Sequence, residues 1–138
     1  ARATAWMVLR DFAQAQRALV LALALDPDDP DTLAAGADLY INRLKPDYDF
    51  LQIGREYARR GFHGARNQQT LLRVKLALLE AFALDALGEP VEALARVDAA
   101  LSIDPGHRAA RHERALLEND RQARKAIPQR LDVYQRCG

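Results

Sequence analysis

Apolar residues recur along this chain at intervals of three and four positions, with polar residues between them. In the two clearest segments, 12–25 and 90–103, the apolar positions are Phe12, Ala15, Leu19, Ala22 and Leu23, and Val91, Leu94, Val97, Ala100 and Leu101. This spacing places one apolar stripe along a helix, and neighbouring helices must cover that stripe. The alternation of apolar and polar residues that indicates a strand is missing from the sequence. We therefore predict an all-α protein.

Proline and glycine residues divide the chain into helical segments, because both residues interrupt helices. Helices are predicted at 3–25, 31–44, 47–61, 67–87, 90–103, 106–118 and 121–136. Asp31 lies in the first turn of one helix, where an acidic side chain is favourable. Gly88 followed by Pro90 indicates the end of one helix and the start of the next. Pro128 is expected to break or kink the last helix.

One segment occurs twice, as FAQAQRALVLALALDP at 12–27 and as PVEALARVDAALSIDP at 90–105. The alignment pairs Ala15 with Ala93, Leu19 with Val97, Ala22 with Ala100, and Asp26-Pro27 with Asp104-Pro105. A repeated helix that ends at a fixed proline is typical of stacked helical arrays. Such arrays bind ligands far more often than they catalyse reactions.

These residues resemble the tetratricopeptide repeat, a unit of two antiparallel helices in about 34 residues. First-helix positions match at Leu33-x2-Gly36-Ala37-x2-Tyr40 and Ala77-x2-Glu80-Ala81-x2-Leu84, and second-helix positions match in the two repeated segments. The resemblance implies a right-handed α-α superhelix. It would be a single domain, 1–138, with units at about 1–29, 30–66, 67–107 and 108–138.

The chain departs from the repeat pattern in four places. Pro27 and Pro105 are 78 residues apart, about ten more than two periods, and we assign the surplus to the middle unit, with a longer connection after it. Glu80 stands where the family has a large apolar residue, and Arg111 departs from the pattern in the last copy. From Asn119 onward the match ends, and 121–136 is expected to form an atypical closing helix that covers the open end of the stack.

Composition and charge narrow the function classes. The 138 residues are 49% hydrophobic with a formal net charge of +1, which does not favour a nucleic-acid or membrane partner. The single cysteine, Cys137, cannot form an intrachain disulfide. Apolar runs are too short for a membrane span or a secretory signal. A cytoplasmic location in a bacterial cell is expected.

Patterns that carry catalysis or bind metals are incomplete in this sequence. His107 and His112 are five residues apart, on different faces of a helix, and His112-Glu113 lacks the second histidine of H-E-x-x-H. The acidic segment 26–31 lacks the glycine and glutamate of a calcium loop. Cys137 has no activating neighbour in the sequence. We therefore expect no enzyme, no cofactor and no metal site, and interpret these residues as exposed polar groups.

Basic residues are concentrated near the C-terminus. Segment 106–138 contains Arg108, Arg111, Arg114, Arg121, Arg124, Lys125, Arg130 and Arg136, against four acidic residues. Three interpretations stay open for this face: a solvated surface, a contact with nucleic acid and a contact with an acidic protein. A second group, Arg55, Arg59, Arg60 and Arg66, is interpreted as solvated surface.

The resemblance implies that the first helix of each unit lines a concave groove. The candidate protein-binding residues in this groove are Asp38, Asn42, Lys75, Leu78, Phe82, Asp85 and His112. The Lys, Asn and Arg residues with which some family members bind a C-terminal carboxylate are missing at the matching positions, so chaperone tails are not expected as ligands. Leu78 and Phe82 are expected either to receive a helix or apolar peptide, or to lie beneath the closing helix.

The function indicated is a protein–protein interaction or scaffold module that binds a peptide or helix in its groove. Two alternatives stay open. The order of repeats and connector resembles repeat regions that precede a catalytic domain, including some zinc peptidases, in larger multidomain bacterial proteins. The basic face at 106–138 supports the other alternative, nucleic-acid binding. An uncovered end of the stack would favour a homodimer.

Overall fold

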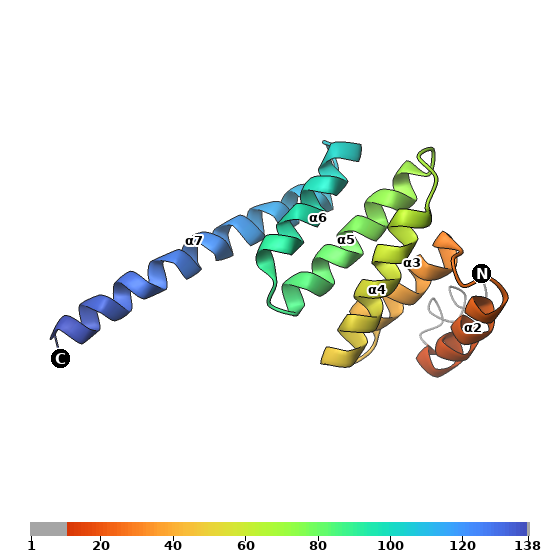
Figure 1. Cartoon of the computed structure of the whole chain (residues 1–138), viewed down its shortest axis with the longest axis horizontal. Coiled ribbons are helices and arrows are strands. Elements are labelled where there is room, and N and C mark those ends of the chain that lie inside the picture. The colour runs from red at the N-terminus through yellow and green to blue at the C-terminus, as the bar shows by residue number, and fades with distance from the viewer. Residues whose placement is uncertain (1–10, 138) are drawn as a thin grey trace.

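The computed structural model describes the backbone of residues 11–137 and the side chains as far as Gln122 (Figure 1). Within residues 11–137 the chain forms helices and loops and no strand, so the all-α prediction is confirmed. The elements in chain order are α2 (Phe12–Leu25), α3 (Pro30–Asp38), the π-helical turn η1 (Leu39–Arg43), α4 (Tyr48–Gly64), α5 (Thr70–Ala86), α6 (Pro90–Ile103) and α7 (Arg108–Cys137).

Consecutive helices pack against one another along the chain. α3 packs against α4, α4 against α5, α5 against α6 and α6 against α7, and α3 also touches α5. In Figure 1 these helices form an elongated array, with α2 at one end and α7 at the other. Most contacts therefore join elements that are close in the sequence, as in helical-repeat proteins.

The N-termini of three helices are fixed by aspartate side chains. Asp11, Asp29 and Asp47 precede α2, α3 and α4, and each accepts a hydrogen bond from the backbone N–H three residues ahead, at 3.1, 3.3 and 3.3 Å. These bonds satisfy N–H groups that have no partner within the helix. After α5, Gly88 has a φ of +81°, a left-handed conformation that suits glycine, and the chain turns there into α6.

The repeated sequence forms two equivalent helices. α2 and α6 each have 14 residues. Each is followed by an aspartate whose backbone N–H bonds to the carbonyl oxygen four residues earlier, at 3.0 Å for Asp26 and 2.9 Å for Asp104. The next helix begins after the same interval in both copies, at Pro30 and at Arg108. The repeat is thus one of helix, turn and following helix.

The hydrophobic core runs through the array as three clusters. The largest joins α5, α6 and α7 and contains Val74, Ala77, Leu78, Ala81, Leu84, Ala93, Val97, Ala100, Ala110 and Leu117. The second joins α2 to η1 and contains Ala15, Ala18, Leu19 and Leu39. The third joins α3, α4 and α5 and contains Ala37, Ala58 and Leu79. Because α5 contributes to two clusters, it is the central helix of the array.

Glycine residues allow α4 to approach its neighbours closely. A Cβ atom on Gly54 would lie 2.5 Å from Ile41 Cγ1, and one on Gly61 would lie 2.7 Å from Leu76 Cδ2. Both distances are shorter than van der Waals contact, so a side chain does not fit without movement of the neighbour. The helix predicted at about 47–61 is α4, which continues past Gly61 to Gly64 because this glycine accommodates α5 and does not end the helix.

α2 begins at Phe12, whereas the helix predicted at 3–25 runs through Asp11 without a break. This residue has the non-helical angles φ −93° and ψ 85°, and α2 begins directly after it. Its side chain accepts the hydrogen bond from Gln14 N, and such a local bond competes with continuation of a helix. Residues 3–10 of the prediction lie outside the described part of the chain.

The surplus of residues relative to the repeat is shared by two units, whereas the sequence analysis assigned it to the middle unit alone. The interval from Pro30 to Thr70, the first residues of α3 and α5, is 40 residues, and that from Thr70 to Arg108 is 38. The units are long because α4 and α5 have 17 residues each. The connection after α4, residues 65–69, is short because α4 extends through Gly64.

The C-terminal segment is one helix where two were predicted. α7 runs from Arg108 to Cys137 without the expected break after residue 118 or at Pro128. Residues 117–126 contain neither proline nor glycine, so nothing in them stops a helix, and Pro128 removes a single hydrogen bond. In Figure 1 the second half of α7 continues beyond α6, so the prediction of a closing helix over the stack is wrong.

Candidate functional site

The groove residues predicted from the sequence are distributed over α3, η1, α5 and α7. On the first two, Asp38 and Asn42 belong to a local network. The Asp38 carboxylate accepts hydrogen bonds from Asn42 Nδ2 at 2.8 Å and from Arg43 Nε at 3.4 Å. The side chains of Asp38 and Asn42 therefore already use part of their hydrogen-bonding capacity within the protein.

On α5, Leu78 and Phe82 contribute mainly to the core. Leu78 is 5% exposed and Phe82 is half-buried, and both pack in the cluster that joins α5, α6 and α7. Lys75 and His112 are exposed to solvent. Of the two apolar groove residues, Phe82 alone offers appreciable surface to a ligand.

Asp85, another groove candidate, lies against a buried acid of α7. Glu113 is 9% exposed because it shares with Ala110 and Leu117 the face of α7 that packs on the core. Burial raises the pKa of Glu113, the negative charge of Asp85 raises it further, and His112 opposes the shift. The interpretation of His112 and Glu113 as exposed polar residues is right for His112 and wrong for Glu113.

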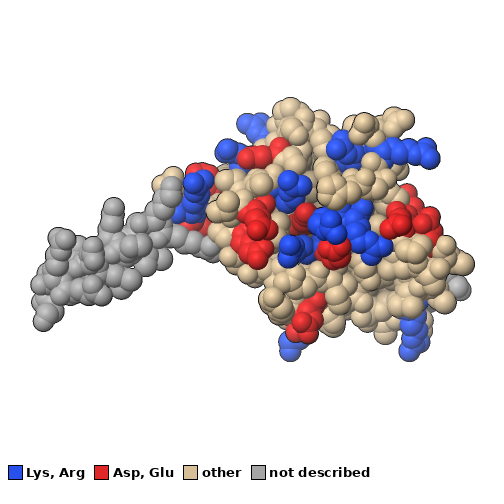
Figure 2. Space-filling view, viewed as in Figure 1, with Lys and Arg blue, Asp and Glu red and all other residues tan. Residues whose placement is uncertain are grey.

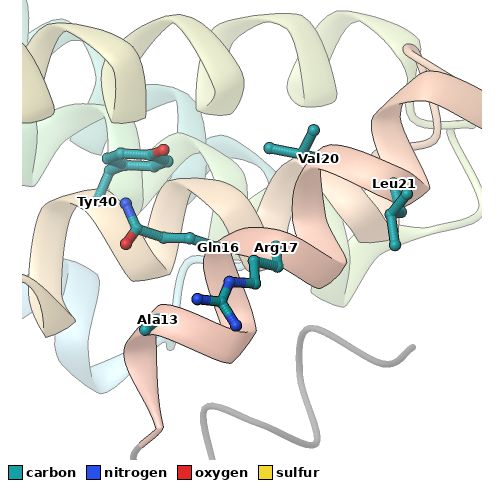
Figure 3. A pocket seen from close by; sticks show the side chains of 6 residues that line it. All are labelled: Ala13, Gln16, Arg17, Val20, Leu21 and Tyr40. Carbon is teal, nitrogen blue, oxygen red and sulfur yellow. The ribbon is translucent and has the colours of Figure 1, made fainter.

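A continuous apolar surface lies on α2. Val20, Leu21 and Leu25 are 64%, 61% and 89% exposed. An open depression of about 640 Å³ beside them is lined by Ala13, Gln16, Arg17, Val20, Leu21 and Tyr40 (Figure 3). An adjoining depression of about 450 Å³ is lined by Ala18, Leu21, Ala22, Ala24 and Leu25. We refer to the residues that line the two depressions as the α2 surface.

The polar and apolar side chains of the α2 surface lie at different places along its larger depression. In Figure 3, Gln16 lies near Tyr40 at one end of the depression, and Val20 and Leu21 lie toward the other. Arg17 lies beside the apolar residues and forms no ion pair with a residue that the structure describes. The surface is therefore an apolar strip with one cation along its side.

The repeat does not require apolar residues at these positions. The alignment of α2 with α6 places Val20 opposite Asp98 and Leu21 opposite Ala99. Asp98 is exposed and forms an ion pair with Arg114 of α7, with Nε 3.0 Å from Oδ1. α2 thus carries large apolar side chains where its internal copy has a charged and a small residue. Contiguous exposed apolar residues are typical of binding surfaces.

A cleft with charges of both signs lies between α4 and α6, with α5 at its base. It has a volume of about 260 Å³ and is lined by Arg55, Arg59, Glu80, Leu84, Glu92, Ala95 and Arg96. Figure 2 shows basic and acidic side chains gathered along the middle of the face formed by these helices. We refer to this feature as the charged cleft.

Glu80 lies at the base of the charged cleft and is 7% exposed. Within the described part of the chain its carboxyl group has neither a hydrogen bond nor an ion pair. Burial raises the pKa of Glu80, although the positive charges of Arg96 and Arg55 and weaker effects of His63 and Arg59 act in the opposite direction. The Glu80 oxygens are not fully enclosed, because the described residues include no buried side-chain oxygen without a hydrogen-bond partner. Partial burial still disfavours the charged form of this carboxyl group.

The arginines of this cleft were grouped differently in the sequence analysis. Arg55 and Arg59 lie with Arg96, which is distant in the sequence, while Arg60 points to the loop between α2 and α3 and pairs with Asp28 at 3.2 Å. Arg59 and Arg66 are exposed, as the interpretation of solvated surface implies, while Arg55 and Arg60 are half-buried. The four arginines do not form a single group, because Arg60 lies apart from the cleft. Their spacing of four predicts that Arg55 and Arg59 share a face of α4, but no sequence signal places Arg96 opposite them.

The basic C-terminal face is described in part. Arg108, Arg111, Arg114 and Arg121 are exposed, and Arg114 is paired with Asp98. The side chains of the other four basic residues, Arg124, Lys125, Arg130 and Arg136, lie outside the described ones. Nucleic-acid binding by this face stays a prediction.

Comparison with models of protein families, with curated proteins and with solved structures found no match to this chain. The fold defines a class, the all-helical proteins with a repeat-like array, and the likeness to tetratricopeptide repeats rests on the sequence pattern. None of the described helices is long and apolar enough to cross a lipid bilayer. The described residues contain no group of three or more His, Cys, Asp or Glu side chains placed to bind a metal ion.

Proposed function

We propose that this chain is a tetratricopeptide-like solenoid that serves as a protein-interaction or scaffold module, and that its α2 surface binds an amphipathic helix of a partner protein. The observation that supports this most directly is the exposure of Val20, Leu21 and Leu25 on one helix. Their equivalents in α6 show that the repeat can form without large apolar groups at the first two of these positions.

An amphipathic helix suits the shape of this surface. Helices that bind in grooves present apolar side chains at intervals of three, four and seven residues. Leu21 and Leu25 are four residues apart on α2, so a partner helix packed along α2 would cover both. Burial of apolar area contributes about 25 cal/mol per Å², which makes large exposed side chains the main source of affinity.

The positive charge of Arg17 on the α2 surface indicates which polar residues a partner helix should carry beside its apolar face. Arg17 and Gln16 border the larger depression, and the described residues provide no carboxylate for Arg17. A partner helix with an acidic residue next to its apolar face would pair with Arg17. Opposite charges at the rim of an interface favour correct orientation more than raw affinity.

The experiment uses a fluorescein-labelled amphipathic peptide of leucine, glutamate and alanine, with leucines at helical spacing, and measures fluorescence anisotropy with the full chain. We expect saturable binding that Leu21→Asp weakens at least tenfold and Arg17→Glu weakens about threefold. The same peptide with scrambled leucine positions is the control for nonspecific hydrophobic binding.

Two further variants distinguish the α2 surface from the predicted groove. Lys75→Glu and His112→Glu change exposed groove residues and are expected to leave peptide binding unchanged. Loss of binding in these variants together with full binding by Leu21→Asp would place the site in the groove and refute the proposal. A second copy of this chain is the other molecule that could cover the α2 surface, and analytical ultracentrifugation tests for it. A dimer that Leu21→Asp dissociates would show that a second copy covers α2.

A further inference from the structure

The charged cleft contains acidic and basic groups that form no ion pair with one another. Arg96 has neither a hydrogen bond nor an ion pair with a described residue, and Arg55 donates only to Gln52 Oε1, at 3.1 Å. Glu80 at the base and Glu92 at the rim are likewise without an ion pair in the described part of the chain. Four charges of two signs therefore face one small space.

The third guanidinium of the cleft is already engaged. Arg59 donates from Nε to Glu56 Oε2 at 3.0 Å and forms a second bond to the other oxygen of the same carboxylate. A paired bond of this kind fixes the plane of a guanidinium. Arg59 thus contributes to the wall of the cleft, while Arg55 and Arg96 keep donors for a ligand.

We propose that the charged cleft binds a free α-amino acid, with the ligand's ammonium group on Glu80 and its carboxylate between Arg55 and Arg96. Arginine binds carboxylates through paired N–H donors, and two arginines on opposite walls surround a single carboxylate. A buried carboxylate is stabilised by a cation that donates hydrogen bonds to it. The zwitterion satisfies both requirements at once.

Ligands with one charge fit the cleft less well. A simple anion would approach Arg55 and Arg96 but would also face the carboxyl group of Glu80. A simple cation would approach Glu80 but would face two guanidinium groups. Because like charges in a partly buried site repel strongly, each of these ligands loses the attraction that the other group provides.

The size and lining of the cleft favour a small amino acid. A volume of about 260 Å³ corresponds to about nine water molecules. It lies below the range of about 300–1,000 Å³ typical of pockets for drug-sized ligands. Leu84 and Ala95 provide apolar lining for a short aliphatic side chain. This site is on α4, α5 and α6 and does not depend on the helix-binding role of the α2 surface.

The test is a titration of the ¹⁵N-labelled full chain, followed by NMR. L-alanine is expected to shift the amide signals of residues around 55, 80 and 96 along saturable curves. Two relatives of alanine each lack one charge: N-acetyl-L-alanine lacks the ammonium group and L-alaninamide lacks the carboxylate. Both are expected to bind at least tenfold more weakly. Absence of saturable shifts with L-alanine would overturn the proposal, as would equal binding of either relative.

Substitutions locate the two halves of the site. Arg96→Gln and Glu80→Gln are each expected to weaken L-alanine binding at least tenfold. Thermal melting is the check that both variants are folded. Arg111→Gln, which removes an exposed arginine of α7 outside the cleft, is the matched control and is expected to bind as the unaltered chain does. Equal weakening by all three variants would indicate a general charge effect and refute the site.

Discussion

α2 and α6 are two copies of one helix in different surroundings. α6 packs between α5 and α7, and Ala93, Val97 and Ala100 on its inner face are fully buried. α2 packs on α3 and η1, and its inner residues Ala15 and Leu19 are buried to a similar extent. The inner faces are alike because the same positions fill the core in both copies.

The outer faces of these two helices differ. α6 places Asp98 against α7, where it forms an ion pair with Arg114, whereas α2 exposes Val20 and Leu21 at the matching positions. The repeat therefore determines which side of each helix faces the core, and the residues outside the repeat determine which side chains each helix exposes. Differences between copies are a better guide to function here than their similarities.

The largest expected effect tests the inner and outer faces of α2 against each other. Leu19→Ala should lower the free energy of unfolding by about 3 kcal/mol, because it leaves a cavity at a residue that is 2% exposed. Leu21→Ala makes the same chemical change at a residue that is 61% exposed and should change it by less than about 0.5 kcal/mol. Urea denaturation measures both. Equal effects would mean that the outer face of α2 is also packed.

The next effect compares equivalent alanines of the two copies. Ala100→Leu should destabilise the protein by about 2 kcal/mol, because Ala100 is fully buried between α6 and its neighbours. Ala22→Leu at the matching position should be nearly neutral, because Ala22 is only half-buried. Thermal melting compares the pair. The reverse order would mean that Ala22 is packed more tightly than Ala100.

A smaller effect concerns Glu80 of α5, which lies beneath α6 and has an apolar counterpart in the family pattern. Its pKa in the folded state is raised above 4.5 by burial, so the folded state binds the proton more tightly than the unfolded state. The protein should therefore lose stability relative to Glu80→Gln as the pH rises from 4.5 through the raised pKa. At pH 7 we expect the variant to be more stable by about 1 kcal/mol.

The pH dependence of this difference is the informative measurement, because Glu113 also has a raised pKa and remains in both proteins. Urea denaturation at pH 4, 5.5 and 7 gives the difference between the unaltered chain and Glu80→Gln. A difference that stays constant with pH would show that Glu80 has the same proton affinity in the folded protein as in the unfolded protein.

The smallest effect tests the outer contact of α6. Asp98 and Arg114 are 52% and 48% exposed, so their ion pair should contribute less than about 0.5 kcal/mol. A double-mutant cycle with Asp98→Val and Arg114→Gln measures this coupling. Val20→Asp, which introduces the α6 residue into α2, should leave stability unchanged and weaken binding of the amphipathic peptide. A coupling above about 1 kcal/mol would make α7 a structural partner of α6 through this pair.

Much of the fold could be predicted from local signals. The bounds of α6 follow from Gly88 and Pro90 before it and from Asp104-Pro105 after it, and the predicted helix 90–103 coincides with α6. These residues act through backbone conformation, which the sequence determines directly. The predicted bounds differ from the observed ones in two places. Gly61 allows α5 to pack closely and does not end α4, and α7 continues past residue 118, where the repeat pattern ends.

The candidate sites could be predicted less well, for a physical reason. Periodicity shows that α2 has an apolar stripe, but exposure of Leu21 and Leu25 depends on which helices pack beside it. The charged cleft requires that α4 and α6 lie on the same side of α5, which sets Arg96 near Arg55. Contacts between helices that are not neighbours in the sequence depend on packing angles, and residue spacing alone does not supply these angles.

The glycines of the central helices also determine where this protein can change. A side chain on Gly36, Gly54 or Gly61 would have to displace Tyr57, Ile41 or Leu76, so substitution there alters the spacing of the array itself. The exposed side of α2 has no such restriction, because Val20, Leu21 and Leu25 extend into solvent. Random mutagenesis should therefore yield new binding specificities on α2 and loss of folding at the three glycines. The outer face of α2 can therefore change in sequence while the architecture stays constant.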